Sequence, residues 1–124
     1  MSLRLLLALI LFSCSSSPYK KYNLEEVDRI QVNDTANVLL GSITNKEAIQ
    51  GFGDVLKGNP EAVNCKAEGV LMFFKGNDLK LKVNYSITSP GCVSLMINEA
   101  TKQIGYRLNY RSGRFLEYIY ELKK

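Results

Sequence analysis

The second half of the chain alternates between apolar runs and turn-forming residues. Apolar or alternating runs span residues 69–74, 79–87, 92–98 and 104–110. In the run over 79–87 the odd-numbered positions are apolar and the even-numbered ones polar, which is the period of a strand with one buried face. The pattern predicts a four-stranded antiparallel meander over residues 69–110.

Residues 44–57 have the pattern of an amphipathic helix. Thr44 is expected to cap it, with Glu47 three positions later as its reciprocal partner. Gly58, followed by Asn59-Pro60, is expected to end it. One face is apolar and consists of Ile49, Phe52, Val55 and Leu56. We expect this helix to lie on the apolar face of the sheet, which gives an α+β fold.

Two further regions have weaker patterns. Residues 27–32 and 37–40 are short apolar runs separated by turn-forming residues, which predicts a hairpin or two short strands. In residues 115–122 apolar side chains alternate as in a strand, while charged ones recur at helical spacing. We favour a C-terminal helix, because Phe115, Ile119 and Leu122 then share one face; a strand is the alternative.

The N-terminus differs in composition from the rest of the chain. Residues 3–12 are apolar except for Arg4, and the polar segment SCSSSP follows. The apolar run is shorter than the ~20 residues that a helix needs to span a bilayer, and it follows a positive charge. This arrangement is typical of a secretory signal peptide. A short membrane anchor or a buried helix is the alternative.

The junction Leu11-Phe12-Ser13-Cys14 resembles the lipobox of bacterial lipoproteins. The resemblance covers residues 1–17. It implies that a signal peptide, residues 1–13, is removed and that Cys14 becomes the lipid-modified first residue. Phe12 departs from the small or β-branched residue commonest at its place, although permissive lipoboxes of spirochaetes and Bacteroidetes accept it. Ordinary signal cleavage, which leaves Cys14 free, is the alternative.

The same resemblance implies a domain organisation and a location. Residues 14–26 become a lipidated tether, and residues 27–124 a single α+β domain. Two or three acyl chains hold a protein stably on a membrane that it does not span. In Gram-negative lipoproteins the lack of an acidic residue after the cysteine favours the outer membrane, and Ser15 follows Cys14 here. The expected location is the bacterial cell envelope, facing the periplasm or the cell surface.

The chain has three cysteines and no histidine. With Cys14 assigned to lipid, Cys65 and Cys92 form a pair, which in a small exported domain predicts a disulfide. A two-cysteine metal site is the alternative, but it lacks further ligands. Strands near the two cysteines would lie about 9.6 Å apart, whereas a disulfide needs Cα atoms within roughly 6.8 Å. Cys65 must therefore lie in a loop that folds over the end of the middle strand.

A basic and aromatic segment near the C-terminus, YRLNYRSGR, is the main candidate for a binding surface. Tyrosine and arginine are enriched at interface hot spots. The candidate residues are Arg107, Asn109 and Arg111 on the outer face of a strand, with Arg114 nearby and with Lys80 and Lys82 from another strand. Such a surface would suit an acidic partner, lipopolysaccharide phosphate or peptidoglycan. The alternative is an ordinary solvated face with the tyrosines in the core.

Composition narrows the function classes. Without histidine the Ser-His-Asp and Cys-His arrangements and the commonest zinc sites are unavailable, so we expect no enzyme, cofactor or metal. A net charge of +4 with dispersed lysines is not typical of a nucleic-acid surface.

The leading hypothesis is a lipid-anchored envelope protein whose domain binds another macromolecule. The second is an inhibitor of an exogenous hydrolase of the lysozyme or protease type, which presents a loop such as Thr88–Cys92. A carboxylate- or tyrosine-based enzyme is the third.

Overall fold

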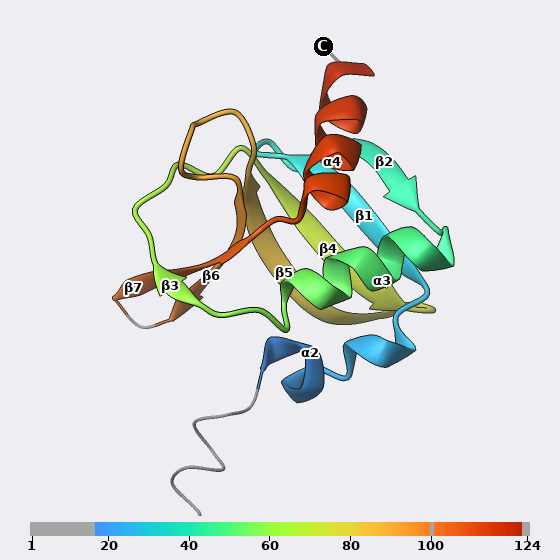
Figure 1. Cartoon of the computed structure of the whole chain (residues 1–124). Coiled ribbons are helices and arrows are strands. Elements are labelled where there is room, and N and C mark those ends of the chain that lie inside the picture. The colour runs from blue at the N-terminus through green and yellow to red at the C-terminus, as the bar shows by residue number, and fades with distance from the viewer. Residues whose placement is uncertain (1–16, 100, 123–124) are drawn as a thin grey trace, which may run out of the picture.

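A computed structural model describes residues 17–99 and 101–122 of the chain. They form a seven-stranded sheet with helices on one side (Figure 1). No helix among these residues is long and apolar enough to cross a membrane. In chain order the elements are α2 (Pro18–Lys21), the 3-10 helix η1 (Leu24–Glu26), β1 (Arg29–Asp34), β2 (Leu39–Ile43), α3 (Lys46–Val55), β3 (Glu61–Ala62), β4 (Gly69–Lys75), β5 (Asp78–Ser86), β6 (Ser94–Glu99), β7 (Lys102–Arg107) and α4 (Tyr110–Leu122).

All strand pairs of the sheet are antiparallel, in the order β2-β1-β4-β5-β6-β7-β3. Strands β4 to β7 are neighbours in both sequence and space, which confirms the meander predicted over residues 69–110. The β1–β2 hairpin adds to the β4 side, and β3 pairs with β7 at the other edge. The predicted α+β class is therefore confirmed, with a wider sheet than the meander alone.

Helices α3 and α4 cover one face of the sheet, and the core fills the space between the two layers (Figure 1). Ile30 of β1 and Leu71 of β4, each 0% exposed, belong to the sheet side, whereas Phe52 of α3 and Leu116 of α4 close it from the helix side. Burial of a large apolar side chain stabilises a protein by about 1.5–3 kcal/mol. The two helices are thus held in place by the core beneath them.

Helix α3 confirms the helix predicted over residues 44–57, but its cap differs. Asn45, not Thr44, is the N-cap, because its side-chain oxygen accepts the Ala48 N–H at 3.0 Å. Both residue types cap helices well, and the path of the chain after β2 decides which of them stands at the first turn. Glu47 is therefore one position too early to be the reciprocal partner of the cap.

Residues 18–26, interpreted from the sequence as part of a tether, pack against the domain. Leu24 is only 4% exposed, and Tyr19 and Tyr22 lie against the core. The Tyr19 ring rests on Gly53 of α3, where an added Cβ would come 2.7 Å from the ring. Three apolar side chains among charged ones are enough to bind this segment to the core, so the folded part begins at Pro18 instead of residue 27.

The alternation predicted over residues 79–87 breaks at Lys80. Phe73 pairs with Leu81 and Phe74 with Leu79, which leaves Lys80 as the extra residue of a β-bulge. The bulge turns Leu79 onto the outer face, where it is 50% exposed. Leu79 thus does not share the buried face with Leu81, as strict alternation predicted.

The C-terminal segment is a helix, as favoured, but it begins at Tyr110 instead of residue 115. The strand predicted to reach residue 110 ends at Arg107. Asn109 starts the helix, because its side-chain oxygen accepts the Ser112 N–H at 2.8 Å and its carbonyl accepts that of Gly113 at 2.9 Å. Tyr110, expected to face the core, is 84% exposed.

The predicted disulfide between Cys65 and Cys92 is present, with Cα atoms 5.8 Å apart. Cys65 lies in the loop between β3 and β4, as the strand spacing required. Gln103 of β7 holds this loop: its side-chain oxygen accepts the Cys65 N–H at 2.9 Å, and its side-chain nitrogen donates to the Cys65 carbonyl at 3.1 Å. The bridge joins this loop to the β5–β6 loop.

Candidate functional site

The structure divides the basic residues that the sequence groups near the C-terminus. Arg107 is exposed at the end of β7, whereas Arg111 and Arg114 lie on α4 and Asn109 caps it. The prediction that Arg107, Asn109 and Arg111 line one strand is therefore wrong beyond Arg107. Arg114 donates to the Glu117 carboxylate at 2.9 Å on the same helix, so its charge is largely compensated.

Lys80 and Lys82 lie apart from these residues. Lys80 is 3.6 Å from the Glu26 carboxylate of η1. Lys82 stands opposite Met72 in the β4–β5 register, on the face of the sheet that does not carry α4. Strand β6 separates β5 from β7 and Arg107. The structure brings together only Asn109 and Arg111 of the six candidate residues.

These two residues line a groove between α3 and α4. The groove consists of two adjoining hollows of about 240 and 400 Å³, which share Glu47, Gly51 and Arg111. Asn109 lies at the second hollow and donates to the Gly51 carbonyl at 3.2 Å, which ties the start of α4 to α3. We call this feature the α3–α4 groove.

The two helices come close together at Gly51. A Cβ at this position would lie 3.2 Å from the Ser112 hydroxyl oxygen, closer than side chains normally pack. Ser112 is 4% exposed and lines the first hollow. Its hydroxyl makes no hydrogen bond with another described residue and is not among the buried polar atoms that lack a partner, so it is accessible from the groove. The groove therefore offers a hydroxyl group that a bound molecule can engage.

The groove combines an apolar floor with charged walls. Ala48, Phe52 and Phe115 form the apolar part of the first hollow. Glu47 on α3 and Arg111 on α4 stand on opposite walls, and no ion pair between described residues includes either of them. An apolar cleft with a few polar groups on its walls is the usual form of a small-ligand site.

Sequence reasoning missed most of this groove. From the sequence, Glu47 is expected to be part of a capping box, and Gly51 is only an interior position of the helix predicted over residues 44–57. Ser112 was not considered, because the last strand was expected to continue to residue 110. The sequence signal for the start of α4 is Asn109, three positions before Ser112, because an asparagine is a common helix cap.

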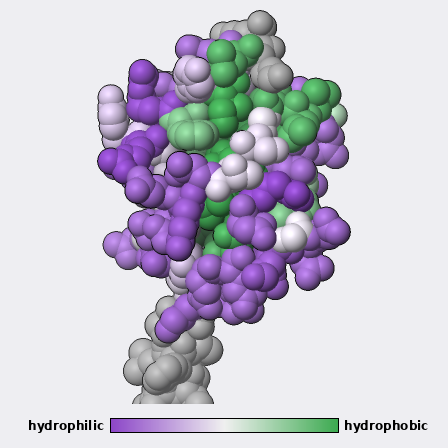
Figure 2. Space-filling model, turned by 90° about the vertical axis from the view of Figure 1, so that its right-hand side faces the viewer, coloured by the Kyte–Doolittle hydropathy of each residue, from purple (hydrophilic) through white to green (hydrophobic). Residues whose placement is uncertain are grey.

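The edge strand β2 forms a different kind of surface. Figure 2 shows apolar side chains gathered in the upper half of this side of the molecule, where β2 and α4 lie, above a hydrophilic lower half. Large exposed apolar residues here include Val38, just before β2, Leu39 of β2 and Leu122 of α4, which are 56%, 52% and 63% exposed. This surface carries no charged group within β2. The α3–α4 groove is the better candidate for selective binding because it is concave and charged.

The loop between β5 and β6 is held at both ends. Glu68 accepts four hydrogen bonds there: from the Ser86 hydroxyl at 3.0 Å, from the N–H groups of Ile87 and Thr88 at 2.8 Å each, and from the Thr88 hydroxyl at 2.7 Å. Cys92 fixes the other end through the disulfide. Residues 88–91 between these points are exposed.

The hydrogen bonds of Glu68 also set its acidity. Burial by itself raises the pKa of this carboxyl group, but the hydrogen bonds from Thr88, Ile87 and Ser86 outweigh burial and hold the pKa below its ordinary value. In the core, burial raises the pKa of Tyr85 to about 12. The fold thus favours the ionised form of the Glu68 carboxyl group.

The lipidation site predicted at Cys14 lies outside the described residues. Within residues 17–99 and 101–122, no group of three or more cysteine, aspartate or glutamate side chains is arranged to hold a metal ion. A scan against protein-family models and searches of curated proteins and solved structures found no match to the chain.

Proposed function

We propose that the protein is a lipid-anchored protein of the bacterial envelope, held in the outer membrane by Cys14, whose domain binds another macromolecule in the α3–α4 groove. The observation that carries the binding role is the groove itself. Its walls bear Glu47 and Arg111 without ion-pair partners among the described residues, and its lining includes the unbonded Ser112 hydroxyl. Glu47 and Arg111 are exposed, so both charges are accessible to a ligand that enters the groove, and a ligand that pairs with them forms charge-assisted hydrogen bonds.

The disulfide supports a location outside the cytoplasm. Disulfides form and persist in the periplasm and at cell surfaces and are rare in the cytosol. The bridge between Cys65 and Cys92 joins two loops and fixes the base of the exposed segment 88–91. A domain that uses such a bridge suits the oxidising side of the inner membrane, where lipobox proteins are delivered.

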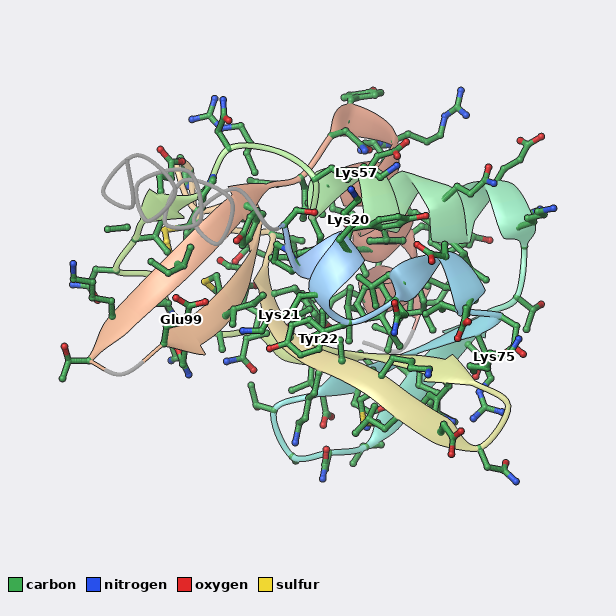
Figure 3. All side chains as sticks on the ribbon, turned by 90° about the horizontal axis from the view of Figure 1, so that it is seen from below. Lys20, Lys21, Tyr22, Lys57, Lys75 and Glu99 are labelled. Atoms are coloured by element: carbon green, nitrogen blue, oxygen red, sulfur yellow. A yellow bond between two sulfur atoms is a disulfide. The ribbon has the colours of Figure 1, made fainter. Side chains whose placement is uncertain are left out.

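The lower end of the molecule suits a position next to a membrane. Figure 3 views this end, with Lys20 and Lys21 of α2, Lys57 after α3 and Lys75 at the end of β4. Only three residues separate Cys14 from Pro18, which limits the distance between lipid and domain to roughly 10–14 Å. Lys57 lies 3.3 Å from Asp54, whereas each lysine without such a partner adds about 1 kcal/mol to membrane attraction when it lies close to phospholipid phosphates. Helix α4 extends to the opposite end of the molecule (Figure 1).

The anchor is tested by Cys14→Ala. We expect the variant to lose lipid attachment and to move from the membrane fraction to the soluble fraction, since two or three acyl chains supply nearly all of the binding. Cys65→Ser with Cys92→Ser is the matched control, and it should remain in the membrane fraction. Membrane association of Cys14→Ala equal to that of the native chain would contradict the anchor.

The binding role is tested by photo-crosslinking in intact cells. A photoreactive residue replaces Gln50, which lines the second hollow, and in a control it replaces Lys82 on the opposite face of the sheet. We expect an adduct from position 50 that disappears when Arg111 is also changed to alanine, and none from position 82. Adducts that persist without Arg111, or that form equally from both positions, would contradict binding in the groove.

The clamped loop favours a second function, inhibition of a hydrolase. Residues 88–91 are exposed between Glu68 and the disulfide, and the Cys92 N–H donates to the Ser89 carbonyl at 3.0 Å, which closes a turn at the tip. A rigid loop loses little entropy when it enters a cleft. A photoreactive residue at Ser89 distinguishes the two functions: an adduct with a hydrolase from position 89, and none from position 50, would support inhibition instead of groove binding.

A further inference from the structure

We infer that the α3–α4 groove recognises a short zwitterionic peptide, with an apolar side chain on the floor, a carboxylate at Arg111 and an ammonium group at Glu47. This inference rests on the proposed binding role of the groove and specifies the chemistry of its ligand. A macromolecule can present such a ligand as a peptide branch that carries both a free ammonium group and a free carboxylate.

The floor of the first hollow selects an apolar group. Ala48 and Phe115 are partly exposed and supply its accessible apolar surface, whereas Phe52 is 0% exposed and belongs to the core. A ligand group that covers this apolar surface removes it from water, which favours binding. The hollow measures about 240 Å³, which is below the roughly 300–1,000 Å³ of drug-sized sites. It therefore suits one side chain and not a whole drug-sized molecule.

The wall formed by α4 selects a carboxylate. Arg111 stands in the first turn of this helix, where the helix dipole is positive, and its guanidinium has no acidic partner among the described residues. The unbonded Ser112 hydroxyl lies next to it and lines the same hollow. A guanidinium and a hydroxyl at a helix N-terminus together offer a carboxylate several donors.

The wall formed by α3 selects a cation. Glu47 lines both hollows and makes no ion pair with a described residue, whereas Asp54, farther along the second hollow, lies 3.3 Å from Lys57. Glu47 is thus the free carboxylate that faces the groove. Because acidic and basic groups stand on opposite walls, a ligand with a single sign of charge leaves one wall unsatisfied.

The polar lining of the second hollow suits a peptide backbone. Its lining includes Gln50 and Asn109 in addition to the shared residues, so it is more polar than the first. The Asn109 amide is already engaged by the Ser112 N–H and the Gly51 carbonyl, but the Gln50 amide can both donate to and accept from the alternating N–H and C=O groups of a peptide backbone. An apolar side chain can thus occupy the first hollow while the backbone passes into the second.

The test uses NMR titration of the full chain in detergent micelles with four probes. They are Leu-Leu, Leu-Leu amide without the carboxylate, N-acetyl-Leu-Leu without the ammonium group, and Gly-Gly without apolar side chains. We expect Leu-Leu to shift the amide signals of Gly51 and Ser112, and each of the other probes to bind about tenfold more weakly or worse, since hydrogen bonds to charged groups contribute about 1.5–3 kcal/mol.

Variants of Arg111 and Glu47 test which charge of the ligand each wall binds. Arg111→Ala should weaken Leu-Leu about tenfold and leave Leu-Leu amide unchanged, and Glu47→Gln should weaken Leu-Leu and leave N-acetyl-Leu-Leu unchanged. The controls are Arg114→Ala, whose guanidinium is already paired with Glu117, and Glu61→Gln on the far edge of the sheet. They should bind all four probes as the native chain does.

Equal binding of Leu-Leu and its two capped forms, or equal effects of Arg111→Ala and Arg114→Ala, would overturn the inference. So would shifts confined to residues outside the groove. The titration needs neither the membrane nor the cellular partner, so its failure is separable from that of the proposed function. If crosslinking from position 50 depends on Arg111 but none of the peptides binds, the groove binds a different ligand. That result overturns the peptide inference and leaves the proposed function in place.

Discussion

Tyr85 is completely buried, 0% exposed, and its position depends on a neighbour without a side chain. It stands opposite Gly69 in the β4–β5 register, and its ring occupies the space where a Cβ at residue 69 would lie. Its hydroxyl donates to the Asn33 carbonyl at 3.4 Å. A large ring over a glycine fills the core here without displacing either strand.

We therefore expect Gly69→Ala to lower the free energy of unfolding by about 1–3 kcal/mol, because the new methyl group forces the Tyr85 ring out of place. Gly113→Ala is the control: its Cβ would meet Val93 at an ordinary 3.7 Å, and alanine stabilises a helix by up to about 1 kcal/mol over glycine. Urea unfolding measures both, and equal stability of Gly69→Ala and the native chain would contradict the packing described.

At the scale of elements, the β5–β6 loop depends on one ionised side chain. Glu68 lies just before β4, and its carboxylate accepts the hydrogen bonds that fix Ser86, Ile87 and Thr88 at the end of β5. These hydrogen bonds fix the start of the β5–β6 loop to the residue that precedes β4. The order of this loop is expected to depend on pH.

Glu68→Gln should lower stability at pH 7 by about 1 kcal/mol, since a neutral amide accepts weaker hydrogen bonds than a carboxylate. The pKa of Glu68 is lowered in the fold, so its contribution is present above the pKa of the unfolded chain and is lost as the pH falls through the folded value. The difference between variant and native chain should shrink below about pH 4. Urea unfolding at pH 7 and pH 3 measures this, with Glu61→Gln as control; a difference independent of pH would contradict it.

At the scale of the whole molecule, the disulfide connects segments that the sheet holds only indirectly. The β3–β4 loop with Cys65 passes over β7, where Gln103 binds it, and Cys92 precedes β6. In Figure 1 this loop and the orange β5–β6 loop lie at the same end of the sheet. The bridge therefore ties the β3 edge of the fold to its centre.

The double variant Cys65→Ser with Cys92→Ser should lower the free energy of unfolding by about 3–4 kcal/mol, because the unfolded chain regains the freedom of the closed loop. Thermal unfolding should show the same loss when the native chain is reduced. The double variant has no disulfide between these positions to reduce, so it is the control. Its melting temperature should not change when the reductant is added. An unchanged melting temperature on reduction of the native chain would contradict this role.

Local periodicity in the sequence was enough to predict much of the secondary structure. Period-two alternation predicted the meander from β4 to β7, the apolar face of residues 44–57 predicted α3, and the even pair of Cys65 and Cys92 predicted the bridge with its loop position. These features depend on the order of apolar and polar residues within a short stretch of chain.

The tertiary structure decided what depends on contacts between distant segments. The bulge at Lys80, the packing of Tyr19 on Gly53 and the start of α4 at Asn109 all arise where one element meets another. The α3–α4 groove belongs to this class, because its lining combines residues of α3 and α4 that are far apart in the sequence. A one-dimensional pattern fixes the face that each helix buries, but the angle and distance between two helices depend on the side chains that both of them bring to the crossing.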